Sequence, residues 1–419
     1  MLGDGTKLGT IPNRPQQALI LDITRMIRRV GRAATGVDRV ERAYFEHFLS
    51  RSCPVFFLCR TSLGFVLLDR DGGNALQRRL DGQVPWGAID RTSRIFSRTT
   101  PEIKQAESDL RRLCTARTIP LGLAKMLRAH LPDRAAYYNV GHSNLGRLSL
   151  PAIKRAGVDI NVLIHDVIPL EFPQFQRPGT VKTFRKRLLM AQRHATRLVF
   201  NSTDTRNRTE AILAQSGTVP PCVVAHLGVT LPKAAGASSL PRPDRPYFIT
   251  LGTIEPRKAH GLLLDVWDAM TSDRGPENVP LLLICGARGW NNEAVFKRLD
   301  AMPAGAPVKE LPDLDDATIA DLLSGSLGLL FPSHAEGFGL PPIEAAALGC
   351  PVVCRDLSIY REILGNIPVY AESDDRYLWQ SIVEHLEADD RATSARKNAD
   401  EFVPPEWDDH FNAVLSSGE

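Results

Sequence analysis

The chain has 419 residues, which is too long for one ordinary core and suits two domains of about 200 residues each. Hydrophobic and charged contents of 43% and 24% are those of a globular protein, and no apolar run is long enough to span a bilayer. Residues 1–240 contain 36 Lys and Arg against 18 Asp and Glu, whereas residues 241–419 contain 15 against 30. This asymmetry predicts two domains with different partners.

The N-terminus and the cysteines indicate the cellular compartment of the protein. The first 17 residues contain no apolar segment of the signal-peptide type. The seven cysteines include no CxxC pair, and Cys285 and Cys354 lie in apolar runs. We therefore expect buried free thiols, no zinc site and a cytoplasmic location.

Short apolar runs alternate with helix-length stretches along the chain. Several runs are apolar throughout, as strands buried on both faces are. This alternation predicts an α/β fold with parallel sheets of βαβ units. The expected strands are 18–23, 54–58, 136–140, 160–166 and 197–202 in the first half, and 247–252, 280–286, 327–333 and 351–355 in the second.

A stretch at 231–246 is rich in Pro, Ala, Gly and Ser and lies where the charge changes sign. It predicts a linker between an N-terminal Rossmann-like domain at 1–230 and a C-terminal one at 247–402. The remaining 403–419 is expected to be a terminal helix. Because GxGxxG after the first strand and GxxxxGK[ST] are both absent, a nicotinamide enzyme and a P-loop kinase are disfavoured.

In the first half, two loops follow expected strands and contain candidate ligand-binding residues. Gly36 precedes a helical stretch and follows the strand 18–23, where open α/β sheets bind ligands. Arg39 in that helix is either a ligand-side residue or a surface base. His165 and Asp166 end the strand 160–166 before a Pro-bearing loop, and Asp166 could equally cap the local turn.

In the second half, Arg257 and Lys258 follow the strand 247–252, and paired cations at such a place can neutralise a diphosphate. Arg257 could instead be a surface cation. Gly286 at the end of the next strand permits close approach to a ligand. Trp290, a few residues later, is expected to be a packing residue rather than a ligand contact.

The segment 329–349 reads LLFPSHAEGFGLPPIEAAALG. Pro341 and Pro342 are expected to open a helix and Gly349 to stop it. The free N–H groups at such a helix start suit a diphosphate. Glu344, inside this helix, could alternatively be an acid favoured by the helix dipole.

These motifs resemble the family-four glycosyltransferases, and in particular the bacterial polysaccharide and mannosyl-type transferases. The matching elements are EGFGLP..EA at 336–345, G-x-x-x-PRK at 252–258, TGxxRV at 35–40 and HD at 165–166. The resemblance implies a GT-B fold, in which two Rossmann-like domains with parallel sheets face each other across a cleft. It also implies that the C-terminal helix crosses back to the first domain.

The resemblance also implies roles for individual residues. Glu336 would contact sugar hydroxyls and Glu344 the nucleotide ribose, while Arg257 and Lys258 would face the donor phosphates. His165 would lie near the transferred sugar, with Asp166 and Arg39 on the acceptor side. The donor-binding set further comprises Gly36, Gly252, Thr253, Gly286, Gly337, Phe338, Gly339 and Leu340, with Thr253 replacing an arginine that some members carry.

The implied reaction is retaining, metal-independent transfer from a nucleotide-diphospho-sugar, such as GDP-mannose or a UDP-sugar, to a glycan or lipid-linked glycan in bacterial surface polysaccharide assembly. No cofactor, metal or nucleic acid is expected. Asp313 and Asp315 have DxD spacing but precede a helix, so we interpret them as a surface acid run. Two alternatives remain: a GT-B nucleotide-sugar epimerase, and a non-catalytic nucleotide-sugar-binding partner in an assembly complex.

The segment 181–197 predicts a basic amphipathic helix. Such helices can lie on anionic membranes, and the excess positive charge of residues 1–240 favours an anionic partner. The alternative is a helix packed on the sheet with a solvated basic face. We therefore expect an anionic acceptor, reached in the cytoplasm or at the inner face of the plasma membrane.

Overall fold

The computed structural model describes residues 17–32, 34–231, 240–388 and 402–416. Residues 232–239 of the predicted linker therefore lie outside the described part. The strands are β1 (Ala18–Asp22), β2 (Val55–Thr61), β3 (Gly64–Leu68), β4 (Ala116–Thr118), β5 (Ala135–Asn139), β6 (Asp159–Ile164), β7 (Arg197–Phe200), β8 (Cys222–Val224), β9 (Tyr247–Leu251), β10 (Leu281–Cys285), β11 (Val308–Leu311), β12 (Gly328–Phe331), β13 (Val352–Arg355) and β14 (Val369–Ala371).

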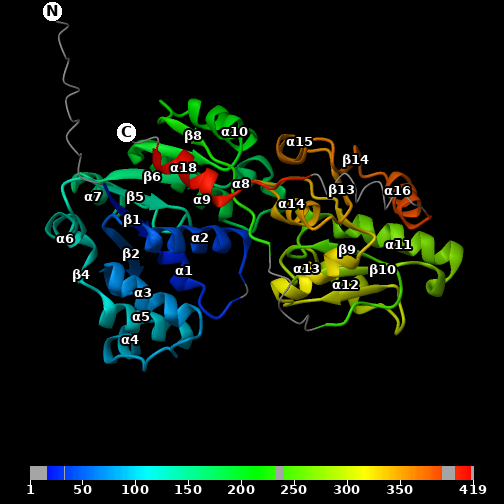
Figure 1. Ribbon diagram of the computed structural model, residues 1–419, viewed down its shortest axis with the longest axis horizontal. Coiled ribbons are helices and arrows are strands. Elements are labelled where there is room, and N and C mark those ends of the chain that lie inside the picture. The colour runs from blue at the N-terminus through cyan, green and yellow to red at the C-terminus, as the bar shows by residue number, and fades with distance from the viewer. Residues whose placement is uncertain (1–16, 33, 232–239, 389–401, 417–419) are drawn as a thin grey trace, which may run out of the picture. The chain divides into compact units, whose positions relative to one another are not determined.

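Helices fill most of the connections between these strands (Figure 1). They are α1 (Thr24–Arg28), α2 (Gly36–Ser50), α3 (Arg70–Leu80), α4 (Arg91–Phe96), α5 (Pro101–Leu113), α6 (Leu123–His130), α7 (Leu150–Arg155), α8 (Ile168–Glu171), α9 (Thr180–His194), α10 (Thr203–Ala214), α11 (His260–Arg274), α12 (Glu293–Asp300), α13 (Asp316–Gly325), α14 (Leu340–Ala347), α15 (Ser358–Leu364), α16 (Arg376–Ala388) and α18 (Trp407–Ser416).

The first sheet has the strand order β4-β3-β2-β1-β5-β6-β7-β8. Its centre is parallel, with Leu19 opposite Val55 on one side and Ala136 on the other. The predicted parallel arrangement is confirmed for most of the sheet, and one edge departs from it, where β2, β3 and β4 pair antiparallel. The cause is a tight hairpin that turns at Ser62 and Leu63 and returns through Gly64, whose φ of 131° favours glycine.

The second sheet has the order β11-β10-β9-β12-β13-β14, and its paired strands are parallel. The strands β9, β10 and β12 are buried at every position, which explains their continuous apolar sequence. All nine strands predicted from the sequence are present in the two sheets. The structure adds β3, β4, β8, β11 and β14.

By their internal contacts, the residues group into two compact units. Unit 1 comprises the described residues of 1–32 with Val37–Val162 and His194–Thr196, and unit 2 comprises those of 33–36 with Leu163–Arg193 and Arg197–Glu419. In unit 1, α3 and α5 lie side by side against β2 and β3 (Figure 1). In unit 2, α11 packs along α16, and their tryptophans Trp267 and Trp379 are fully buried in one apolar core.

The C-terminal helix α18 returns to the part of the chain around β8. The N–H of Val229 donates to the Pro405 carbonyl (2.9 Å), and His410 Nδ1 lies 3.0 Å from the His226 carbonyl oxygen. Gly228 permits this approach, because a Cβ there would lie 2.4 Å from the Trp407 ring. The predicted terminal helix is present and contacts β8 of the first sheet, while its packing on the predicted N-terminal domain stays a prediction.

The cysteines are all free thiols, and Cys285 and Cys354 are buried as expected. Burial raises the pKa of the Cys285 thiol to about 12, so it stays protonated and packs as a small apolar group. Among the described residues, no helix combines the length and apolar character that a bilayer span requires.

Candidate active site

Three loops at the carboxyl ends of β9, β10 and β12 form the centre of the site. These strands are neighbours and parallel, so their following loops meet at one edge of the sheet. Gly252 and Gly286 are packed backbone to backbone, because a Cβ on Gly286 would lie 2.2 Å from the Gly252 carbonyl oxygen. Only glycine fits at position 286. The two glycines therefore present backbone atoms, not side chains, at the ends of β9 and β10.

A buried ion cluster lies directly beside these glycines. Glu336, which is 8% exposed, accepts from Arg257 (Nη1 to Oε1, 2.5 Å) and from Lys258 (Nζ to Oε1, 2.6 Å). The Ser333 hydroxyl is 2.5 Å from the same carboxylate oxygen. Lys258 Nζ also lies 4.2 Å from the centre of the Phe331 ring, a cation–π distance. The carboxylate is thereby held by three donors in one orientation.

The pKa values in this cluster follow from burial and mutual attraction. Burial opposes the charge of Glu336, but Arg257 and Lys258 outweigh it and lower the pKa of Glu336 to about 2. Burial lowers the pKa of Lys258, and the attraction of Glu336 opposes that shift. Burial likewise acts against the charge of Arg257, but Glu336 and Glu255 raise its pKa. Glu336 is thus a fixed negative charge at neutral pH.

The loop that carries His165 and Asp166 packs against Gly337 within unit 2. A Cβ on Gly337 would lie 2.3 Å from the His165 carbonyl oxygen, so only glycine allows this approach. Asn201 donates to that same carbonyl (2.9 Å), and Thr205 donates to the Gly337 carbonyl (3.0 Å). The structure therefore brings the HD and EGFG motifs together, although 170 residues separate them in the chain.

Asp166 performs the turn role that the sequence left open. Its Oδ1 accepts the Ile168 N–H (3.0 Å) at the start of α8. Burial raises the pKa of this carboxyl, while Arg257 opposes that shift, which places Asp166 within electrostatic range of the ion cluster. A turn-forming role and a place at the site are therefore compatible.

The start of α14 has the geometry that the prolines and glycines predict. Gly339 caps the helix at φ 80°, and a Cβ there would lie 2.4 Å from the Tyr360 ring. Gly36 lies beside Leu340, since a Cβ on Gly36 would be 3.5 Å from the leucine Cδ1. The helix ends before Gly349, whose φ of 71° is the left-handed conformation expected after a helix.

Residues 235–401 match the family model of the glycosyl transferases group 1. The match covers less than half of the chain, and we refer to this matching segment as the group 1 domain. It contains the ion cluster, the strand-end glycines and all of α14.

Several curated relatives resemble the chain over part of its length. The serotype-specific mannosyltransferase WbdA of Escherichia coli is 30% identical over 230 residues, which cover 51% of this chain and 28% of that protein. The O-antigen chain mannosyltransferase RfbU of Salmonella typhimurium is 29% identical over 148 residues, covering 34% and 38%. The chain thus spans well under half the length of these two relatives.

Among solved structures, Anabaena HepE in complex with UDP and glucose superposes with a TM-score of 0.60. The match covers 96% of this chain and 98% of HepE at 13% identity, so it shows the fold alone. The GT-B fold predicted from the motifs is confirmed.

For four of the predicted site residues, the structure gives the position and burial but does not test the predicted role. Glu344 lies in α14 of the group 1 domain and is half-buried. Phe338 is buried beneath the motif, and Thr253 is half-buried between Gly252 and the isolated bridge at Ile254. Arg39 lies on α2 in unit 1, so its acceptor-side role stays a prediction.

Contacts favour one reading for each of two alternatives drawn from the sequence. Trp290 donates to the Phe175 carbonyl (3.0 Å), and Arg177 stacks over its ring at 4.5 Å, which agrees with the packing role. Asp315 caps α13 by accepting the Thr318 N–H (2.7 Å), which gives this acid a structural role.

Sequence reasoning missed Ser333, Glu255 and Tyr360 in the group 1 domain. Glu255 binds Arg257 through Oε1 at 2.7 Å, and Ser333 binds Glu336. Both lie within or beside the recognised motifs, so their closeness in sequence to Arg257 and Glu336 could have predicted these contacts. Tyr360, fully buried against Gly339, lies outside those motifs and carried no such signal.

Proposed function

We propose that the protein is a glycosyltransferase that moves a sugar from a nucleotide-diphospho-sugar to a hydroxyl of a glycan or lipid-linked glycan. The observation that carries this proposal is the buried cluster of Glu336, Arg257 and Lys258 beside the backbone of Gly252 and Gly286. The names of WbdA and RfbU, both mannosyltransferases and one assigned to the O-antigen chain, support a place in bacterial polysaccharide assembly.

In this proposal the donor diphosphate lies at the loops after β9 and β10 and at the start of α14. Arg257 and Lys258 stabilise the negative charge that develops on the leaving phosphate, together with the free N–H groups of the helix start. Glu344 binds the ribose, one helical turn into α14. The glycine backbones allow the diphosphate to approach without a side chain in the way.

Glu336 binds sugar hydroxyls and acts through its charge rather than as a nucleophile. Its three donors hold the carboxylate in place, and its low pKa keeps it ionised. A fixed negative charge stabilises the positive character that the sugar gains as the bond to the phosphate breaks. In this proposal His165 and Asp166, whose loop packs against Gly337, face the sugar and the acceptor. The transfer retains configuration in this proposal.

The experiment is incubation with a panel of nucleotide-sugars, with and without glycan acceptors, analysed by mass spectrometry. We expect one donor to give a product heavier than the acceptor by one sugar. Isomerised or hydrolysed donor with no need for an acceptor would favour the epimerase. Donor binding without turnover in any mixture would favour the non-catalytic partner. The relatives' names as transferases favour the first outcome.

The same assay in EDTA tests the metal-independent chemistry. We expect activity to survive the chelator, because Arg257 and Lys258 supply the positive charge that a divalent ion would otherwise provide. Loss of activity in EDTA, restored by Mg²⁺ or Mn²⁺, would contradict this and direct attention back to Asp313 and Asp315. We place the reaction in the cytoplasm, at or near the inner face of the plasma membrane.

A further inference from the structure

Unit 1 carries a surface that combines exposed apolar side chains with unbalanced positive charge. Ile95 and Phe96 on α4 are 72% and 66% exposed, and Ile119 and Leu121 after β4 are 65% and 84% exposed. We call these four residues, with the arginines around them, the α4–β4 patch. Large apolar side chains are rarely left this exposed in adjacent elements unless they bind something.

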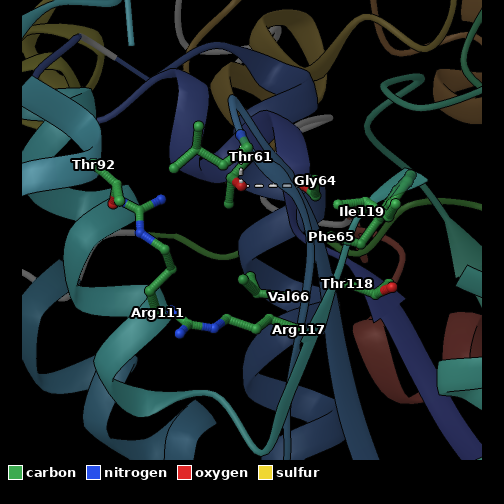
Figure 2. Close-up of a pocket in the computed structure, with 10 residues that line it drawn as sticks. Thr61, Gly64, Phe65, Val66, Thr92, Arg111, Arg117, Thr118 and Ile119 are labelled. Carbon is green, nitrogen blue, oxygen red and sulfur yellow. Dashed lines mark hydrogen bonds between the residues drawn. The ribbon is translucent and has the colours of Figure 1, made fainter. Parts of the chain in front are cut away.

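A pocket of about 410 Å³ joins the two halves of the patch. Figure 2 shows Thr92 of α4 on one side and Thr118 and Ile119 at the end of β4 on the other. Ile95 and Phe96 lie three and four positions after Thr92 in α4, so they share its face of the helix. Ile119 lines the pocket directly, and Ile95 and Phe96 follow the pocket residue Thr92 on the same short helix.

Positive charge predominates in the stretches around the pocket. Residues 91–101 and 110–130 contain eight Arg and Lys and no Asp or Glu. Between these stretches, Glu107 and Asp109 are buried and matched to arginines, which leaves Glu102 as the exposed carboxylate. Among the ion pairs of the described residues, none includes Arg91, Arg94, Arg98, Arg117 or Lys125. Those cations are available to an anionic partner.

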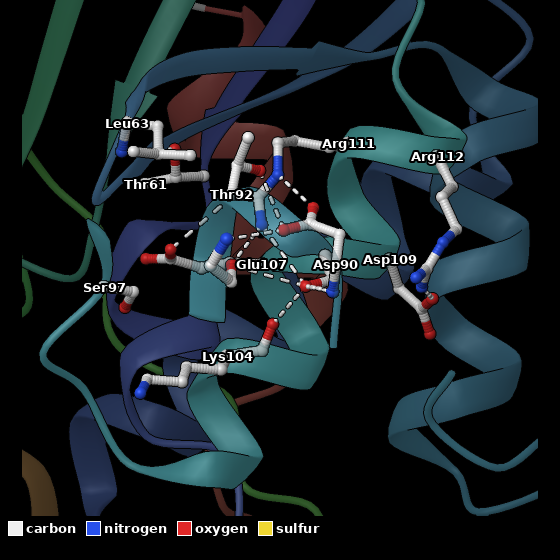
Figure 3. A network of polar contacts seen from close by, with 12 residues as sticks. Thr61, Leu63, Asp90, Thr92, Ser97, Lys104, Glu107, Asp109, Arg111 and Arg112 are labelled. Carbon is white, nitrogen blue, oxygen red and sulfur yellow. Dashed lines mark hydrogen bonds and ion pairs between the residues drawn. The ribbon is translucent and has the colours of Figure 1, made fainter. Parts of the chain in front are cut away.

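A buried polar network holds the pocket in shape. Arg111, whose side chain is 6% exposed, donates to Asp90 (Nε to Oδ2, 2.7 Å), and Asp90 caps α4 by accepting the Ser93 N–H (2.6 Å). Figure 3 shows Arg111 between Asp90 and Glu107, with Thr92 beside them. Arg111 therefore fixes α4 onto α5, and Arg117 is the pocket arginine that remains exposed.

We propose that the α4–β4 patch docks on an anionic phospholipid bilayer. The apolar side chains would enter the boundary between headgroups and acyl chains, and the arginines would contact lipid phosphates. The pocket places Arg117 and threonine hydroxyls where a headgroup phosphate would lie. This inference does not require the transfer reaction, because binding is measured with no donor present.

The segment 181–197 is a weaker candidate for the same role. Helix α9 exposes its basic residues, but its apolar positions Leu188 and Ala191 are 3% and 0% exposed. An amphipathic helix needs a free apolar face to enter a membrane interface. The packed alternative that the sequence left open is therefore favoured for α9, and the free apolar face lies at the α4–β4 patch.

The test is sedimentation of the full-length chain with phosphatidylcholine vesicles, with and without phosphatidylglycerol. We expect binding only to the anionic vesicles and weakening as salt rises. The double variants Phe96→Ser/Leu121→Ser and Arg94→Glu/Arg117→Glu should each weaken binding by about tenfold or more. Because all four side chains are exposed, the variants should keep the melting temperature of the wild type.

Matched controls make the outcome specific to the patch. Tyr377→Ser/Val403→Ser removes two apolar side chains of unit 2 that are 71% and 79% exposed, and Lys182→Glu/Arg185→Glu reverses two charges on α9. Both controls should bind as the wild type does. Equal binding to neutral vesicles, or loss in the α9 control alone, would overturn the proposal. So would patch variants that change the oligomeric state but not vesicle binding, since the patch would then be a contact between copies of the chain.

Discussion

Glu336→Gln should lower turnover by about 100- to 1000-fold while the protein stays folded. The substitution keeps the shape of the side chain but removes the charge that Ser333, Arg257 and Lys258 hold in place. In the proposed function that charge faces the reacting sugar, so its loss should act mainly on the transition state. Donor affinity, measured by calorimetry, should change less than turnover.

The matched control for this variant is Glu310→Gln. Glu310 also pairs with an arginine, Arg288 (2.7 Å), but it lies on β11 at the edge of the sheet. We expect its turnover to be that of the wild type. If Glu336→Gln were equally active at the wild-type melting temperature, Glu336 would have no part in the chemistry.

Lys258→Ala should weaken the binding of a nucleoside diphosphate by about 10- to 100-fold, since a hydrogen bond to a charged group is worth about 1.5–3 kcal/mol. Its ammonium lies beside Gly252, because a Cβ on that glycine would be 3.5 Å from Nζ. The exposed Lys309 on β11 provides the control Lys309→Ala, which should bind as the wild type does.

A double-variant cycle separates a direct phosphate contact from an effect through Glu336. If Lys258 acted only by holding Glu336, then Lys258→Ala would cost nothing further in the Glu336→Gln background. We expect an additional loss of affinity in that background, because in the proposed function the lysine also contacts the diphosphate. An unchanged affinity would reduce Lys258 to a positioning residue.

The sequence predicted the buried strands well and the edge strands poorly. The strands β9, β10 and β12 are buried throughout and therefore read as unbroken apolar runs. By contrast, β14 has three residues and β11 has the sequence VKEL, with exposed positions that give no such run. Edge strands face solvent on one side, so their pattern is weak.

The sequence predicted the motifs of the site one by one, but it did not predict which residues of different motifs contact each other. Local signals sufficed for the start of α14, since the prolines and glycines act within one turn. The contact of Glu336 with Arg257 and Lys258 joins residues almost 80 positions apart, and it exists because β9 and β12 are neighbours in the sheet. Strand order is a property of the whole fold, so this contact had no local signature.

The central claim is tested most directly by the mass of the acceptor after incubation with a nucleotide-sugar. We predict that one donor of the panel adds one sugar to a glycan or lipid-linked glycan, that a nucleoside diphosphate is released in equal amount, and that Glu336→Gln nearly abolishes both products. Release of the nucleotide with no change in acceptor mass, or the same yield from Glu336→Gln as from the wild type, would contradict the proposal.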